Sequence, residues 1–146
     1  MEIQISFQEG IPGLNNQKIK TKLAKILRDL GCPDKELSIL FTDDTRIAQL
    51  NRSYLGRNGA TNVLAFPMGG GPTPDFDSPM LGDVVISVTT AVKESEAFGE
   101  PLEHTIGRLL IHGVLHLLGY DHEKSIAEAT QMQKKETRLM KLIKED

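Results

Sequence analysis

The spacing of apolar residues changes from a strand period to a helix period early in the chain. Ile3, Ile5 and Phe7 recur at every second position, which is the period of a half-buried strand. Over residues 16–30, apolar side chains recur at the three- and four-residue spacing of a helix, and Gly31 follows as a stop signal. The pattern therefore predicts a strand followed by an amphipathic helix.

The middle of the chain alternates short apolar runs with helical patterns. Residues 37–41 read as a strand, and the side-chain oxygens at 42–44 are of the kind that cap a helix, here one that runs to about Tyr54. Residues 63–66 predict a further short strand. The β-branched run 84–88 predicts a strand that is buried on both faces. The glycine- and proline-rich stretch between these two strands is expected to be a loop.

Three helical patterns complete the chain. They cover residues 89–98, a stretch from Pro101 to a stop at Gly119, and a mostly charged stretch over 124–144. The order β-α-β-α-β-β-α-α-α predicts an α/β (α+β) fold in which a small, mostly four-stranded mixed sheet is packed with about five helices. Since no linker interrupts the pattern, we expect residues 1–146 to form a single catalytic domain.

Composition narrows the classes of protein that fit this pattern. The 146 residues are 39% hydrophobic and 25% charged, and 17 basic against 20 acidic residues give a formal charge of −3. Nucleic-acid binding, if present, must therefore use local positive charge. Cys32 is the only cysteine, which excludes an intramolecular disulfide and a cysteine-based zinc site. The chain lacks the features of a secretory signal and of a membrane span, so we expect a cytoplasmic location and no membrane partner.

Three of the four histidines fall close together, at His112, His116 and His122. Residues four apart on a helix share one face, so His112 and His116 can both reach one metal ion. An uninterrupted helix would point His122 about 120° away from His116. Gly119 is placed to end the helix, because glycine adopts the left-handed conformation of a helix C-terminus at little cost. The turn that follows can then bring His122 back as a third ligand.

Three neutral imidazoles leave a fourth position on the ion for water. Zinc lowers the pKa of such a water to about 7, and the ion can also polarise a phosphoryl or carbonyl oxygen. An open position is typical of catalytic zinc rather than structural zinc. The spacing therefore predicts a metal-dependent hydrolase with one Zn²⁺ ion, or another divalent transition metal, per chain. In such a hydrolase, His112, His116 and His122 would take part in catalysis through the water that the metal ion binds.

The spacing H-x-x-x-H-x-x-G-x-x-H also resembles the longer metzincin protease signature H-E-x-x-H-x-x-G-x-x-H. In those proteases the glutamate after the first histidine is the general base. The corresponding residue in this chain is Gly113, which can neither accept nor donate a proton. Proteolysis by that mechanism would lack its base.

Three segments together resemble the YbeY endoribonucleases, a family of bacterial rRNA maturation factors. Residues 112–122, HGVLHLLGYDH, match the family's H-G-x-L-H-L-x-G-Y-D-H. Residues 61–67, TNVLAFP, resemble T-[DN]-V-L-S-F-P with Ala65 in place of serine. Residues 81–87, LGDVVIS, resemble L-G-D-[IV]-x-I-S. Order and separations agree over 50–122, about half of the chain.

This resemblance implies a zinc-dependent endoribonuclease that is specific for single-stranded RNA. It implies action in processing the 3′ end of small-subunit rRNA and in ribosome assembly. The expected substrate is a single-stranded region of rRNA, and the expected partners are the small ribosomal subunit or its assembly factors. His112, His116 and His122 carry over as the metal ligands.

One position departs from the family's pattern. Where the family commonly has Tyr-Arg-Gly-Lys, this chain has Tyr54-Leu55-Gly56-Arg57, so the family's arginine is replaced by Leu55. Arg57 can supply a positive charge from the same loop, and its fork of donors matches two phosphate oxygens. It is the candidate phosphate contact, although a solvated loop arginine is an equal interpretation.

Several alternatives are open at this point. Asp121 either holds an imidazole or caps the last helix, Arg108 either faces the cleft or forms a surface salt bridge, and His104 is expected at the surface. Two other functions fit the same histidines. One is a metalloprotease-like or other metal-dependent hydrolase, and the other is a non-catalytic ribosome assembly factor with a structural metal.

Overall fold

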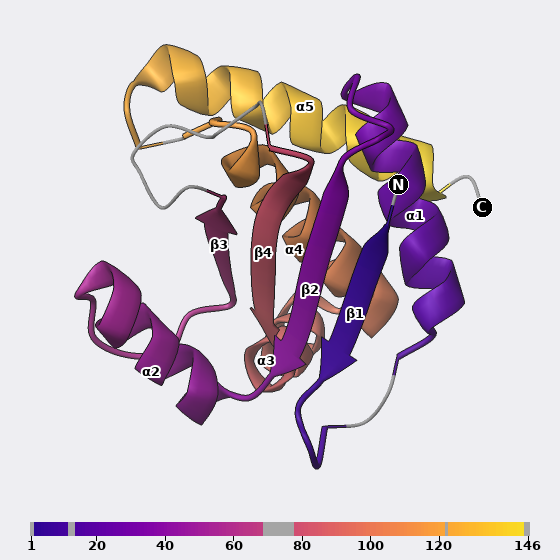
Figure 1. Ribbon diagram of the computed structural model, residues 1–146. Helices are drawn as coiled ribbons and strands as arrows, with labels where there is room; N and C mark the ends of the chain where they lie inside the picture. The colour runs from indigo at the N-terminus through magenta and orange to yellow at the C-terminus, as the bar shows by residue number, and fades with distance from the viewer. Residues whose placement is uncertain (1, 12–13, 69–77, 122, 145–146) are drawn as a thin grey trace.

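A four-stranded mixed sheet forms the middle of the molecule (Figure 1). The computed structural model describes residues 2–11, 14–68, 78–121 and 123–144. The strands lie in the order β1-β2-β4-β3, of which the first three are parallel while β3 runs antiparallel to β4. Their bounds are Ile3–Phe7 for β1, Glu36–Thr42 for β2, Val63–Pro67 for β3 and Met80–Ser87 for β4.

Helices cover the two faces of this sheet unequally. The five helices of the described ranges are α1 (Asn16–Asp29), α2 (Asp44–Leu55), α3 (Val88–Phe98), α4 (Leu102–Leu117) and α5 (Ile126–Lys144). One face carries α1, α3 and α4, with α5 packed across α4 and α1, while α2 lies against the other face (Figure 1). The element order and the α+β class are those that the sequence predicted.

The fourth strand differs from its prediction at both ends. It begins at Met80 rather than at 84. The sequence did not predict this first half, because Gly82 and the exposed Asp83 interrupt the apolar run that marks a buried strand. It ends one residue early, at Ser87. The Ser87 hydroxyl accepts a hydrogen bond from the Thr90 backbone N–H at 3.2 Å and so caps α3, which begins at Val88.

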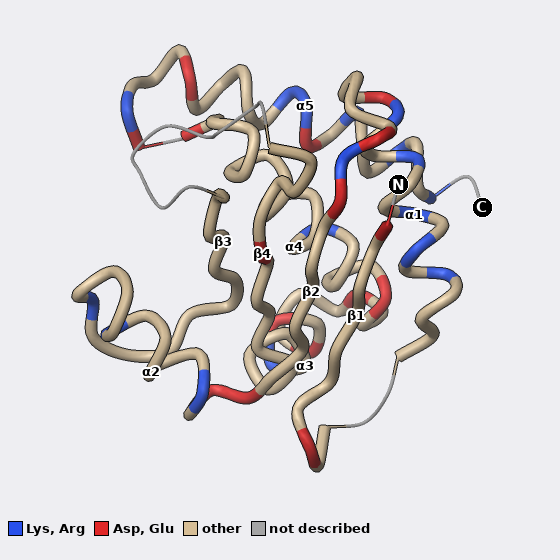
Figure 2. The backbone as a smooth tube through the Cα atoms, viewed as in Figure 1, with Lys and Arg blue, Asp and Glu red and all other residues tan. Residues whose placement is uncertain are grey.

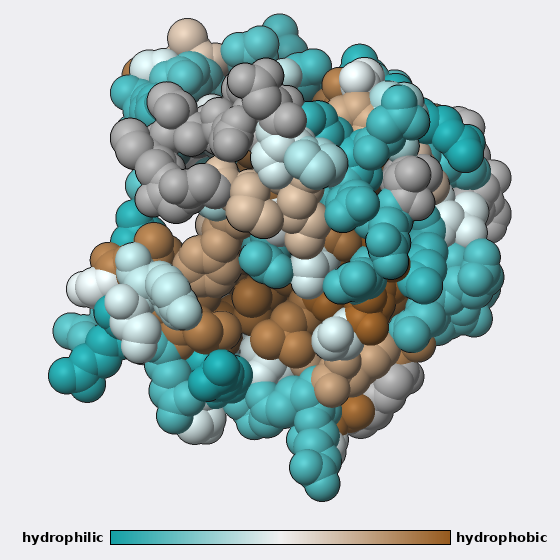
Figure 3. Space-filling model, viewed as in Figure 1, coloured by the Kyte–Doolittle hydropathy of each residue, from teal (hydrophilic) through white to brown (hydrophobic). Residues whose placement is uncertain are grey.

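Alternate residues of the strands build two separate apolar clusters. The larger one lies between the sheet and its helices and includes Ile39, Phe41 and Ile86, all of which are fully buried. The smaller cluster lies under α2 and joins Ile47 to Val85. Figure 3 shows that face, with apolar side chains gathered between α2 and the middle of the sheet.

Charge is spread around the outside of this core. The basic residues of α1 lie at the β1 side of the sheet, whereas α2 and β3 lie at the opposite side (Figure 2). Within the described ranges, no helix combines the length and the apolar character needed to cross a bilayer.

Candidate functional site

The close approach of α4 to the sheet fixes the floor of the site. A Cβ atom added at Gly113 would lie 2.6 Å from Val84 Cγ1 and 3.4 Å from Val63 Cγ2. The first distance is too short for two carbon atoms, so no side chain fits between α4 and β4 here. The position that carries the general base in metzincin proteases therefore faces a packed sheet in this fold.

His112 and His116 lie on the face of α4 that is left partly open. Their Nε2 atoms are 3.1 Å apart, and the ring planes meet at 70°. Two nitrogen ligands of a tetrahedral zinc ion are separated by about 3.3 Å, because each lies about 2.0–2.1 Å from the metal. The two imidazoles are thus spaced like two ligands of one ion, as the four-residue spacing predicted.

A carboxylate that the sequence analysis did not single out lies behind His112. Glu136 Oε2, from α5, is 3.4 Å from His112 Nδ1. Nδ1 therefore faces α5 while Nε2 faces His116. A sequence signal for this contact exists, since Glu136 is an acidic residue at the spacing of the buried Met132 and Leu139.

The helix ends where the sequence predicted. Helix α4 runs to Leu117, and Gly119 has a φ of 97°. The Tyr120 N–H donates to the Leu115 carbonyl at 3.1 Å, and the Gly119 N–H donates to the His116 carbonyl at 3.0 Å. This pair of bonds is the Schellman arrangement that reverses the chain after a helix.

The third predicted ligand, His122, lies outside the described residues. The convergence of all three imidazoles therefore stays a prediction. Among the residues that the structure describes, no group of three or more His, Cys, Asp or Glu side chains is placed to hold a metal ion.

A cleft of about 560 Å³ opens beside the two imidazoles. Strand β3, the loop after α2 and the turn after α4 form its walls. Its lining includes Arg57, Asn62, His112, His116, Tyr120 and Asp121.

Arg57 reaches this cleft from a loop that Asn51 fixes. The Asn51 side chain donates to the Gly59 carbonyl at 3.0 Å, and its backbone carbonyl accepts from the Arg57 N–H at 3.3 Å. Gly56 ends α2 in the left-handed conformation. The Arg57 side chain is 64% exposed, and its Nη2 atom lies 3.8 Å from Glu123 Oε2. The structure thus brings Arg57 to the same cleft as the two histidines, together with Leu55.

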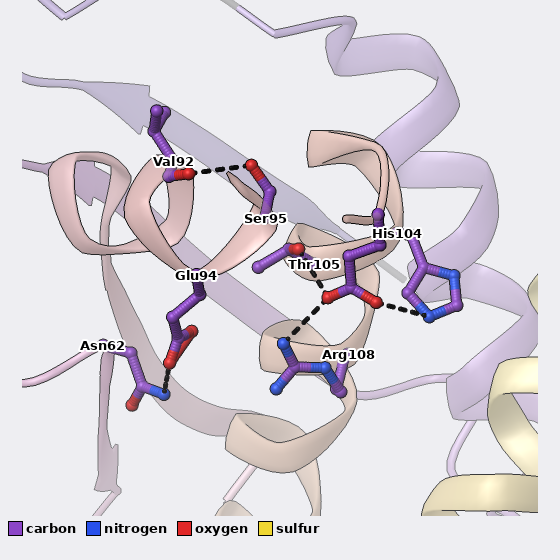
Figure 4. A network of polar contacts seen from close by, with 8 residues as sticks. Asn62, Val92, Glu94, Ser95, His104, Thr105 and Arg108 are labelled. Carbon is purple, nitrogen blue, oxygen red and sulfur yellow. Dashed lines mark hydrogen bonds and ion pairs between the residues drawn. The ribbon is translucent and has the colours of Figure 1, made fainter. Parts of the chain in front are cut away.

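Asn62 is a cleft residue that the sequence analysis did not identify. Its Nδ2 donates to Glu94 Oε1 of α3 at 2.9 Å (Figure 4). The second oxygen of Glu94 is buried and has no hydrogen-bond partner among the described residues. Only the fold brings α3 beside the start of β3, so no local sequence pattern points to this pair.

Arg108 and His104 lie at a different place, around Glu100 (Figure 4). Glu100 Oε1 accepts from Thr105 Oγ1 at 2.7 Å and from Arg108 Nη2 at 3.0 Å, and His104 Nε2 is 3.2 Å from Glu100 Oε2. The hydrogen bond from Thr105, with that from Arg108, holds the pKa of the Glu100 carboxyl below its ordinary value. The salt-bridge interpretation of Arg108 is therefore correct, and His104 lies at the surface as a partly buried partner of Glu100.

In the described contacts, Asp121 neither holds an imidazole nor caps α5. Its Oδ1 accepts from the Glu123 N–H at 2.8 Å and so closes the turn after α4. The hydroxyl that accepts from the first turn of α5 is that of Ser125, bonded to the Glu128 N–H at 3.1 Å.

The fold and the cleft together define a class of protein. It is a small α+β domain in which the helix that crosses a mixed sheet presents two imidazoles beside a loop arginine. A protein of Thermotoga maritima whose solution structure is known has the same fold, with a TM-score of 0.68 and 24% sequence identity. That similarity covers 97% of this chain and 88% of the other.

Sequence comparison gives the family. The family model described as endoribonuclease YbeY matches residues 4–144. The endoribonuclease YbeY of Syntrophus aciditrophicus is 41% identical over 144 residues, which is 98% of this chain and 90% of the relative. That of Syntrophotalea carbinolica is 45% identical over 137 residues, which is 90% of this chain and 91% of the relative. The chain belongs to the endoribonuclease YbeY family.

Proposed function

We propose that this chain is a zinc-dependent endoribonuclease that cleaves single-stranded RNA in the cytoplasm. We further propose that it processes the 3′ end of small-subunit rRNA and acts with the small ribosomal subunit or its assembly factors. The family is named for the cleavage of RNA, and the chain is accordingly an enzyme of the hydrolase class. The observation that carries the zinc part of the proposal is the 3.1 Å separation of the Nε2 atoms of His112 and His116 within the cleft.

One zinc ion, or another divalent transition metal, would be held by His112 and His116, with His122 as the proposed third ligand. Imidazole nitrogen is a ligand type that zinc prefers, and the spacing of the described pair suits a tetrahedral ion. When bound, such an ion supplies a Lewis acid beside the scissile phosphate. That the native ion is zinc is part of the proposal.

Arg57 is the proposed phosphate-binding residue. A guanidinium presents a planar fork of N–H donors, which matches two oxygens of one phosphate group. Its present neighbour in the described residues is the Glu123 carboxylate at 3.8 Å, and both side chains are more than half exposed. A pair so exposed is held together weakly, so a phosphate can replace Glu123 at the guanidinium.

The packing at Gly113 favours this proposal over a protease. A metzincin-type base would need a side chain at a position where a Cβ atom already meets Val84 Cγ1 at 2.6 Å. Hydrolysis of a peptide by that mechanism would therefore need a different base.

The alternative in which the metal is only structural predicts that His116→Ala unfolds the protein and that no RNA cleavage is ever observed.

The test is to incubate the purified protein separately with a single-stranded RNA, a duplex RNA and casein. We expect cleavage of the single strand alone. His116→Ala should be inactive yet folded by circular dichroism, and His104→Ala is the matched control, because it removes an imidazole from the same helix but outside the cleft. Cleavage of casein without cleavage of RNA would overturn the proposal.

A further inference from the structure

Glu136 is an acidic residue on the apolar face of α5. Its neighbours at helical spacing on that face are Met132, Leu139 and Ile143, which are at most 3% exposed. The Glu136 side chain is only 27% exposed. A carboxylate that has lost most of its contact with water is costly unless another polar group satisfies it.

The polar group that the structure provides is an imidazole of the proposed metal site. Glu136 Oε2 lies 3.4 Å from His112 Nδ1, and in the described part of the chain this is the one polar contact of the Glu136 side chain. His112 is similarly enclosed, with 28% of its side chain exposed. The contact joins α4 to α5 across 24 residues of sequence.

The position of the carboxylate decides which nitrogen of His112 carries the proton. A carboxylate can only accept, so a neutral His112 that donates to it carries its proton on Nδ1 and its lone pair on Nε2. That lone pair is on the side of His116, whose Nε2 atom lies 3.1 Å from His112 Nε2. A ligating histidine commonly donates its second N–H to a carboxylate, which fixes the ring and raises its basicity.

We propose that Glu136 is a positioning residue that orients His112 and fixes its tautomer for zinc binding. The inference rests on the proposed function only in taking zinc as the ligand. This positioning role differs from a purely structural role of the contact between Glu136 and His112. A structural link between α4 and α5 would affect the stability of the metal-free protein, whereas a positioning residue affects the affinity for the metal.

The variant Glu136→Leu separates these two roles. Leucine continues the apolar stripe of Met132 and Leu139, so the metal-free protein should unfold at an unchanged or higher temperature. Its zinc affinity, measured by competition with a chromophoric chelator, should nevertheless fall by about 10–100-fold, as for other carboxylates behind a ligating histidine. Glu136→Gln keeps an oxygen that can accept from Nδ1–H, so it should recover most of the affinity.

Glu96→Ala is the matched control, because it removes one negative charge from an exposed position on α3 and should leave zinc affinity unchanged. Wild-type affinity in Glu136→Leu would overturn the inference, as would equal losses in Glu136→Leu and Glu136→Gln. Absence of zinc binding by the wild-type protein would overturn both this inference and the proposed metal dependence. Zinc binding that weakens in Glu136→Leu, in a protein that cleaves no RNA, would support the inference and overturn the proposed function alone.

Discussion

At the scale of single residues, Gly113 shows how packing restricts chemistry. Helix α4 lies on β4 so closely that the space next to Gly113 is already filled by Val84. Ten of the sixteen residues of α4 are buried, so the helix cannot move away from the sheet without disturbing the core around it. The histidines on either side of this contact are held by the same packing.

Replacing Gly113 by alanine should therefore destabilise the protein by about 1–3 kcal/mol, the usual cost of an extra methyl group in a packed core. Gly107→Ala is the matched control on the same helix. There the nearest atom to an added Cβ is the flexible end of Ile143 at 3.0 Å, and the gain in helix propensity offsets the small shift required. Denaturant unfolding measures the free energy of unfolding of both variants. Equal stability of Gly113→Ala and wild type would show that the tight contact is absent.

Arg57 gives a second prediction at this scale. Arg57→Ala should lower kcat/KM for single-stranded RNA by about 10–100-fold, because a charged donor to phosphate is lost. Arg57→Lys should retain part of the activity, since lysine keeps the charge but loses the fork of donors. Arg46→Ala removes an exposed arginine from α2 outside the cleft and should have no effect. An unchanged rate in Arg57→Ala would assign phosphate binding to another group.

The sequence was informative at this scale where chemistry follows from local spacing. The pairing of His112 with His116 and the helix stop at Gly119 both follow from helix geometry, and the structure confirms both. The role of Glu136 required knowledge of how α5 lies on α4, and the pairing of Asn62 with Glu94 required knowledge of how α3 lies beside β3. Such contacts depend on tertiary packing, which no local pattern encodes.

At the scale of elements, Asp44 connects the start of α2 to the start of α3. Its Oδ1 accepts from Ser87 Oγ at 2.6 Å and also from the Thr90 hydroxyl, and Lys93 Nζ is 3.8 Å from Oδ2. The hydrogen bonds from Ser87 and then Thr90 are the main reason that the pKa of the Asp44 carboxyl is lowered. Two helices that begin at neighbouring strand ends are thereby joined through one carboxylate.

The pH dependence of Asp44→Asn follows from this shift. Because the folded-state pKa of Asp44 lies below its unfolded value of about 3.9, the carboxylate stabilises the fold above that value and stops doing so as the pH falls through the folded-state pKa. Asp44→Asn should thus be less stable than wild type by about 1 kcal/mol at pH 7, with the gap closing below about pH 4. Urea unfolding across pH checks this. Asp34→Asn, in an exposed turn, is the control. A stability gap that stays constant down to pH 2 would show that the charge of Asp44 does not stabilise the fold.

Element types and order were predictable because apolar periodicity differs clearly between strands and helices. The start of β4 was not, since Gly82 and Asp83 interrupt the apolar run while the backbone still pairs with β2. The cap of α5 was also not predictable, and the sequence left Asp121 open between holding an imidazole and capping this helix. Ser125 and Asp121 are both suitable cap residues by type, and only the path of the chain after Gly119 selects Ser125.

At the scale of the whole molecule, charge distribution limits where RNA can bind. The formal charge of −3 opposes a polyanion, so binding depends on cations near the cleft. Arg57 and Lys124 line the cleft, whereas the basic residues of α1 lie at the β1 side of the sheet (Figure 2). The cleft and α1 are therefore separate sources of positive charge.

The double variant Arg57→Gln/Lys124→Gln should raise the KM for single-stranded RNA and flatten its salt dependence. Each phosphate contact that is removed reduces the slope of log affinity against log salt by about 0.7. Lys18→Gln/Lys22→Gln on α1 removes the same charge from outside the cleft and should leave KM within about twofold of wild type. The reverse pattern would place the RNA along α1 instead.

The proposed function requires that RNA cleavage depends on a metal ion held by His112, His116 and His122. The most direct test measures cleavage of single-stranded RNA by untagged protein that has been stripped of metal with a chelator and then titrated with zinc. We expect no cleavage by the stripped protein and full activity at about one zinc ion per chain. His116→Ala, prepared in parallel to exclude a contaminating nuclease, should stay inactive throughout. Undiminished cleavage by the stripped wild-type protein would show that the enzyme needs no metal ion.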